Sequence, residues 1–390
     1  MNKNNILKNT LVGTVSALAL AVSAASSAVE LTTVGDTKLF ISGYAKLDMM
    51  YDVNGVRAGA SGLGDSFSFG NIGVGGADTD GHFKLHANES RIGFQTITPT
   101  EKGDLTTFIE GDFWFGDFRL RHAYGSWNGI TAGQTWTNFT TFIGTTRTLD
   151  FTSQLGRSGA NRQSQIRYST NGFHVALEAP HGVVSSNAYE IDVDEGVLGT
   201  ADTNRKFIAP DLTLRYEQGQ GAFKYAAAGM VRQIAYDDGA NDDSVTGWGL
   251  TAAASYDFGS GTTLRGHVTG GDGVGFYLYS HTPMAAAYLQ GGELTTIAGL
   301  GATIGVSQKI GAGSVNLAYS RVTADWDDAE RDGLDVGARD ETRQITSLNY
   351  IWSPTKSVTY GVEMLWGERE TVAGDSGDAV RLQTSVIYNF

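Results

Sequence analysis

The last twelve residues of the chain, 379–390, read AVRLQTSVIYNF and alternate between apolar and polar side chains. Successive side chains of an extended strand point to opposite faces, so this pattern gives one apolar and one polar face. The apolar face carries Val380, Leu382, Val386, Tyr388 and Phe390. The polar face carries Arg381, Gln383, Ser385 and Asn389. The stretch therefore predicts a strand that borders two different environments.

The same alternation continues through most of the chain and predicts an all-β fold. Residues 356–368 repeat it, with Tyr360 and Trp366 opposite Glu363. We predict sixteen strands, near 38–51, 83–97, 104–113, 117–127, 130–136, 162–170, 172–180, 209–217, 221–236, 247–258, 261–270, 293–308, 313–324, 342–352, 356–368 and 379–390.

The connections between these strands alternate between two classes. The short class comprises Asn128-Gly129, Asn171-Gly172, 218–221, 259–261 and 353–355. Asn-Gly is the favoured two-residue hairpin loop because both positions need positive φ. The long class comprises 52–82, 137–161, 181–208, 237–246, 271–292, 325–341 and 369–378. Short turns at one rim and long loops at the other are typical of outer-membrane barrels.

Aromatic residues gather near strand ends, as in the pairs Tyr256 with Phe258 and Tyr388 with Phe390. Amphipathic rings concentrate at membrane–water boundaries. A large soluble all-β domain would explain the strands, but neither the turn asymmetry nor the aromatic placement. We therefore predict a transmembrane antiparallel β-barrel of 16 strands in a Gram-negative outer membrane, with short periplasmic turns and long extracellular loops.

Residues 1–28 have the layout of a secretory signal peptide. Lys3 and Lys8 precede an apolar stretch, and Ser26 and Ala28 form an A-x-A-like cleavage site. No later stretch of about 18 apolar residues could form a membrane helix. No Pro-rich or Ser-rich linker divides residues 29–390, so we expect one barrel domain there.

Charge and cysteine content exclude several classes of protein. The formal net charge is -14, which argues against nucleic acid as a partner because phosphate binding needs a basic surface. The absence of cysteine points away from a small disulfide scaffold. The loops 181–208, 237–246 and 325–341 are rich in carboxylates, which would face lipopolysaccharide through bridging divalent cations.

A dedicated calcium site in the acidic loop 325–341 is not supported. Counting from Asp328, the twelfth position is Arg339, where a calcium loop needs a bidentate glutamate. We therefore interpret the segment as a solvated acidic loop and predict no metal site.

The polar faces of the strands differ in charge from the loops. Their basic residues are Lys46, Arg91, Arg119, Arg121, Arg167, Arg215, Lys224, Arg232, Arg265, Arg343 and Arg381. Their acidic residues are Asp48, Glu89, Glu110, Asp112, Glu178, Glu217 and Glu363. Arginines that line a water-filled pore favour anions and can clamp carboxylates. Alternatively, these arginines only balance the carboxylates and brace the wall.

The loop 137–161 is unusually apolar for a surface segment, with Phe139, Phe142 and Phe151. We expect it to fold into the barrel and narrow the pore, with Arg147 or Arg157 across from the arginines of the wall. A loop used for capping or subunit contact is the alternative.

Several motifs resemble the DcaP-like porin family. They are Ser42–Asp48, Glu89–Phe94, Arg119–Gly125, Gly133–Trp136, Thr148–Phe151 and Arg162–Tyr168. They are dense from 42 to 168, and afterwards only the barrel pattern and the ending Tyr388-Asn389-Phe390 continue them. The family's periplasmic coiled-coil extension does not fit in the ten or so residues between residue 28 and the first predicted strand.

The resemblance implies a homotrimer of 16-stranded barrels whose arginine-rich constriction passes dicarboxylates and similar small organic anions. It assigns the constriction to Arg119, Arg121, Arg162 and Arg167. Alternation by itself places Arg162 on the apolar face or at the loop rim.

Other functions have less support. No His-Glu-x-x-His, G-x-S-x-G or phosphate-loop spacing occurs, and His174 and His267 have no obvious serine partner, so we predict no enzyme and no cofactor. A general, weakly selective porin and a plugged structural or adhesive barrel remain as alternatives. Sixteen strands favour an open lumen.

Overall fold

The computed structural model describes residues 28–76, 78–159, 161–180, 191–193, 205–280 and 285–390. The predicted signal peptide, apart from its last residue, lies outside the described residues. Most of the acidic loop 181–208 lies outside them as well. Within the described ranges, no helix combines the length and hydropathy needed to cross a membrane.

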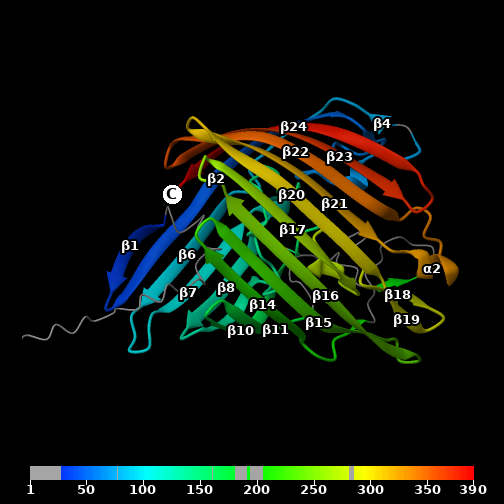
Figure 1. Ribbon diagram of the computed structural model, residues 1–390, viewed down its shortest axis with the longest axis horizontal. Helices are drawn as coiled ribbons and strands as arrows, with labels where there is room; N and C mark the ends of the chain where they lie inside the picture. Colours follow the sequence, from blue (N-terminus) through cyan, green and yellow to red (C-terminus); the bar gives the residue numbers. More distant parts are fainter. Residues whose placement is uncertain (1–27, 77, 160, 181–190, 194–204, 281–284) are drawn as a thin grey trace, which may run out of the picture.

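The strands form one closed antiparallel barrel of sixteen strands, which confirms the predicted fold (Figure 1). Strand β2 closes it by pairing with β24 from Tyr44↔Asn389 onward and with β6 over Lys38–Tyr44. The wall strands are β2 (Thr37–Asn54), β6 (Arg91–Thr98), β7 (Leu105–Asp112), β8 (Arg119–Trp127), β9 (Ile130–Trp136), β10 (Arg162–Thr170), β11 (Phe173–Glu178), β14 (Asp211–Gln220), β15 (Phe223–Asp237), β16 (Asp242–Asp257), β17 (Thr262–Asp272), β20 (Ala298–Ile310), β21 (Gly313–Ala324), β22 (Asp340–Thr355), β23 (Val358–Thr371) and β24 (Ser376–Asn389).

Alternation along the strands separates an apolar outside from a polar inside. On β16, Leu250 is 60% exposed on the outer face, whereas its neighbour Thr251 is 4% exposed on the inner face. Tyr256 and Phe258 also remain exposed, and their rings pack at 4.8 Å near the end of the strand. The polar faces therefore enclose the lumen, as the alternation predicts.

The two Asn-Gly hairpins adopt the predicted left-handed backbone. Asn128 and Gly129 have φ of 49° and 80°, and Asn171 and Gly172 have 48° and 83°. A side chain at Gly172 would approach the Glu217 carbonyl oxygen to 2.5 Å, so the position also needs glycine for close packing.

Several predicted boundaries were wrong. The strand predicted at 83–97 is interrupted, with β5 (His82–His86) and β6 both pairing with β2. The loops predicted at 237–246 and 369–378 shrink to short turns, because β15, β16, β23 and β24 continue as hairpins beyond the apolar pattern.

Two further strands differ from the prediction. Strand β1 (Val29–Val34), which precedes the first predicted strand, forms a hairpin with the start of β2. Figure 1 shows it at the rim that also carries the C-terminus, opposite the rim with α2 (Asp327–Arg331). The segment predicted to start the strand 293–308 is β19 (Glu293–Thr296), which pairs with β18 (Ala287–Gln290) outside the barrel sheet.

Loop segments pack an apolar core against the inner wall. Phe67 and Phe69 from 52–82, Phe139 and Leu155 from 137–161, and Tyr277 from 271–292 belong to one buried cluster. The cluster also includes inward side chains of five wall strands, among them Met230, Ile345 and Leu365. The sequence predicted only the loop 137–161 to enter the lumen; 52–82 and 271–292 do so too.

Candidate functional site

The loop 137–161 begins on the wall from which it emerges. The Glu178 carboxylate of β11 accepts hydrogen bonds from the Thr137 hydroxyl at 2.6 Å and the Asn138 amide at 2.5 Å. Arg215 of β14 donates to the Thr140 carbonyl oxygen at 2.8 Å. The start of the loop is therefore fixed to β11 and β14.

The same loop then crosses to distant strands. The backbone amides of Leu149 and Asp150 donate to the Glu363 carboxylate of β23 at 3.0 and 2.9 Å. The Lys46 ammonium of β2 donates to the Leu149 carbonyl oxygen at 2.9 Å. The Ser158 amide donates to His267 Nε2 of β17 at 3.2 Å. The loop thus spans the interior between opposite walls.

The last part of the loop, which includes Gly156 and Gly159, lies against the segment Tyr277–Tyr279. The Gly156 amide donates to the Tyr279 carbonyl oxygen at 3.0 Å, and the Gly159 amide donates to that of Tyr277 at 2.7 Å. Gly156 has φ of 69°, and a side chain there would come within 2.4 Å of the Arg321 carbonyl oxygen on β21. Only glycine permits this close approach to the wall.

One group of wall arginines is paired with carboxylates. Arg121 contacts Glu110 and Asp112, each at 2.7 Å, and Arg119 makes a bidentate contact with Asp112 at 3.0 and 2.9 Å. Arg215 contacts Glu217 at 3.2 Å. The remaining ion pairs of this group are Arg232–Asp211, Arg343–Asp340 and Arg381–Asp52. These arginines brace the wall.

A second group has no ion pair with a carboxylate in the part of the chain that the structure describes. Arg157 and Arg162 are 6% and 4% exposed, and Arg91 and Arg167 are half-buried. Arg265 donates to the Ser307 hydroxyl at 2.8 Å. Arg147 is exposed, and only its carbonyl oxygen is fixed, by Asn349 at 2.9 Å.

Aromatic rings lie beside three guanidiniums of this second group. Arg162 lies 4.7 Å from the Trp136 ring centre, and Arg157 lies 4.0 Å from that of Tyr279. Arg91 lies 5.2 Å from the ring centre of Tyr44. A cation over an aromatic face is attracted by the ring quadrupole but is not neutralised. The ring contacts therefore do not compensate the charges of Arg157 and Arg162, whereas Arg91 also interacts electrostatically with Glu89, Glu110 and Asp112.

Arg162 lies at the end of the loop 137–161, as in the loop-rim alternative, and its side chain is buried beside Trp136. It is the first residue of β10 and pairs with Trp136 in the same unbroken register as the exposed Ile166. It interacts electrostatically with Arg91, Arg119 and Arg121. In the loop, burial lowers the pKa of the Arg157 guanidinium. A bound anion would stabilise the charged form of both guanidiniums.

Sequence reasoning missed the aromatic partners Trp136 and Tyr279. Trp136 lay within a quoted motif, but period-two alternation carries no signal for a ring that packs under an arginine. The candidate enzyme histidines His174 and His267 contact hydroxyls of Ser169 and Thr251. Among the described residues, no group of three or more His, Asp or Glu side chains could hold a metal ion.

The sixteen-stranded barrel with its polar, charged interior defines an outer-membrane porin-type channel. The model of the DcaP outer membrane protein family matches residues 1–390. The chain belongs to this family. Among curated protein sequences, none matches the chain significantly.

Solved structures share the fold at low sequence identity. The outer membrane channel DcaP of Acinetobacter baumannii is 22% identical, with a TM-score of 0.75, and the match covers 93% of this chain and 100% of that chain. An anion-selective porin from Comamonas acidovorans is 13% identical, with a TM-score of 0.53, covering 91% and 100%. A loop-deletion mutant of OmpT from Vibrio cholerae is 11% identical, with a TM-score of 0.56, covering 91% and 100%.

Proposed function

We propose that the protein is a porin for passive diffusion of small polar solutes that favours small organic anions such as dicarboxylates. The observation that carries the proposal is the group Arg91, Arg157 and Arg162, which lies inside the barrel and makes no ion pair with a carboxylate of the described chain. The loop 137–161 narrows the lumen beside them.

The physical reason is the cost of an isolated buried charge. A guanidinium taken out of water without a counter-ion is strongly disfavoured unless a partner compensates it. A carboxylate that enters the constriction supplies that partner through charge-assisted, bidentate hydrogen bonds. A cation meets uncompensated positive charge at the same place.

The zero-current potential across a planar bilayer under a salt gradient tests this proposal. We expect wild-type protein to be anion-selective and Arg162→Gln to lower the anion-to-cation permeability ratio by roughly twofold or more. Arg343→Gln is the matched control, because it removes the same charge while Arg369 still pairs with Asp340 at 3.0 Å. Cation selectivity, or equal ratios in wild type and Arg162→Gln, would contradict the proposal.

A plugged structural barrel is a second candidate, favoured by the apolar core that three loops build inside the wall. It predicts no conductance in the same bilayer experiment. A general, weakly selective porin predicts conductance with a permeability ratio near one.

We further propose that the protein assembles as a homotrimer and contacts lipopolysaccharide through its acidic loops. A trimer form of OmpT from Vibrio cholerae is among the porins that share the fold. In the loop 325–341, Asp327, Asp328 and Glu330 lie on the first turn of α2, where carboxylates are exposed to the rim.

A further inference from the structure

We propose a second anion site on the periplasmic side of the constriction, formed by Arg167, His174 and Arg215. It would hold a carboxylate group of a permeating solute after that solute leaves the constriction. The inference deepens the proposed function and rests on it for the class of solute.

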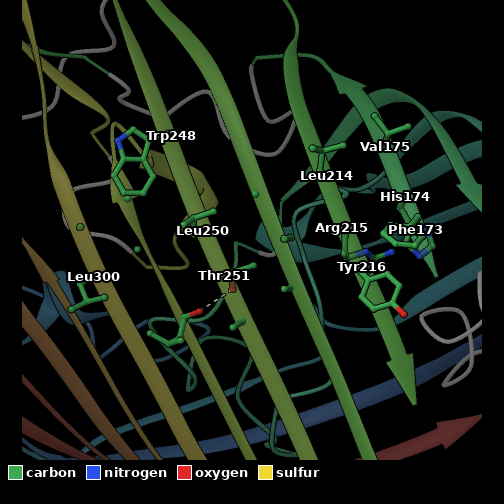
Figure 2. Close-up of a pocket in the computed structure, with 18 of the residues that line it drawn as sticks. Phe173, His174, Val175, Leu214, Arg215, Tyr216, Trp248, Leu250, Thr251 and Leu300 are labelled. Carbon is green, nitrogen blue, oxygen red and sulfur yellow. Dashed lines mark hydrogen bonds between the residues drawn. The ribbon is translucent and has the colours of Figure 1, made fainter. Parts of the chain in front are cut away.

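Strand register brings the three residues together on the inner wall. His174 of β11 is the direct partner of Arg215 on β14 and of Ser169 on β10. Arg167 is the partner of Ala176, the next inward residue of β11. The two arginines therefore stand two strands apart, about 10 Å in the pairing direction, with only Ala176 and His174 between them. Figure 2 shows His174 and Arg215 beside each other.

The site contains polar atoms without partners. Among the described residues, the buried Nε atoms of Arg167 and Arg215 and Nε2 of His174 make no hydrogen bond. Arg215 and His174 are 7% and 6% exposed. Buried donors are normally satisfied, so the two arginine Nε groups indicate a missing acceptor. His174 Nε2 is a third donor in the tautomer whose Nδ1 accepts from the Ser169 hydroxyl. A carboxylate can accept from several donors at once.

Two carboxylates lie near the two arginines of the site, Glu217 and Glu178. Arg167 and Arg215 interact electrostatically with each other and with His174. Glu217 compensates part of the Arg215 charge from 3.2 Å. Arg215 also donates a hydrogen bond to the Thr140 carbonyl oxygen. Glu178 interacts electrostatically with both arginines, so two carboxylates offset the two guanidiniums in number. Arg167 nevertheless makes no ion pair in the described part of the chain, so its guanidinium can still bind a carboxylate of the solute.

The position of the site suits a second anion-binding site along the same permeation path. Arg162 and Arg167 belong to one strand and are five residues apart, which corresponds to about 16 Å. The Asn171-Gly172 turn lies just beyond Arg167 at the periplasmic rim. Two weak sites in series let an ion enter without being trapped, because an arriving ion can displace the one ahead.

Sided block of single-channel chloride current by succinate tests the inference. The chain has no cysteine, so a Ser260→Cys label at a periplasmic turn reports the orientation of each channel through an impermeant thiol reagent. We expect Arg167→Gln to raise the half-blocking concentration of periplasmic succinate about tenfold, as for a loss of about 1.4 kcal/mol. Block from the extracellular side should be unchanged.

Arg343→Gln is the matched control, because it removes an inward arginine that is paired with Asp340 on another part of the wall. Arg167→Lys keeps the charge but loses the Nε donor, and we expect an intermediate effect. Equal periplasmic block in wild type and Arg167→Gln would overturn the second site even if the channel is anion-selective. Loss of periplasmic block in Arg167→Gln, with a wild type that is not anion-selective, would support the site and overturn the proposed function.

Discussion

Arg381 is fully buried, and its guanidinium contacts the Asp52 carboxylate at 2.6 and 3.1 Å. It also donates to the Gly64 carbonyl oxygen at 3.0 Å, while Asp52 accepts from the Leu63 amide at 2.7 Å. One ion pair therefore joins β2 to β24 and fixes the loop 52–82. Arg381 is thus an inward arginine that stabilises the barrel, whereas under the proposed function Arg162, which has no ion pair in the described part of the chain, contacts solutes.

We expect Arg381→Ala to lower the free energy of unfolding by about 3–5 kcal/mol, because it leaves the Asp52 carboxylate buried and unpaired. Denaturant titration of the protein folded in lipid vesicles measures this change. The double variant Asp52→Asn with Arg381→Gln should recover part of the loss, because it removes both charges. A loss below about 1 kcal/mol in Arg381→Ala would mean that water still reaches Asp52.

Under the proposed function, the loop 137–161 is the element that narrows the pore inside the barrel. Its far end is held mainly by Glu363, which accepts two backbone amides of the loop and the Asn349 side chain at 2.7 Å. Hydrogen bonds to a charged acceptor contribute roughly 1.5–3 kcal/mol each. The loop position therefore depends on a few contacts with one carboxylate.

Replacing that carboxylate should widen the channel. We expect Glu363→Ala to give a single-channel conductance roughly twofold above wild type, with more current noise, because the loop leaves the constriction. Glu368→Ala is the control on the same strand, since Glu368 accepts a bond from Gln344 at 2.8 Å and does not touch the loop. Unchanged conductance and noise in Glu363→Ala would show that other contacts hold the loop.

The whole molecule is organised with apolar side chains outside and charges inside. Figure 2 shows Trp248 and Leu250 on β16 and Leu300 on β20, two strands that are separated by β17. They are 47%, 60% and 59% exposed, as expected for side chains that contact lipid instead of protein. This inside-out arrangement lets the interior hold water and buried ion pairs.

A charge on the outer face should therefore be costly in a bilayer. We expect Leu250→Arg to lower the free energy of unfolding in lipid vesicles by about 2–4 kcal/mol, while Leu250→Met changes it little. Equal stability of the two variants would mean that Leu250 does not face the hydrocarbon.

The sequence by itself determined the strand count, the two Asn-Gly hairpins, the apolar outer face and the charged inner face. Each of these depends on side chains a few residues apart, so period-two alternation and turn residues are sufficient to predict them. The β1 hairpin lacked such a signal, because its residues are exposed on both faces.

Only the tertiary structure decided which arginines find a carboxylate, that Arg162 is buried beside Trp136, and that the loops 52–82 and 271–292 pack within the barrel. These features depend on partners that are distant in the chain: the Leu149 amide meets the Glu363 carboxylate across 214 positions. Such contacts form only once the barrel has closed and brought its opposite walls within reach of the loops.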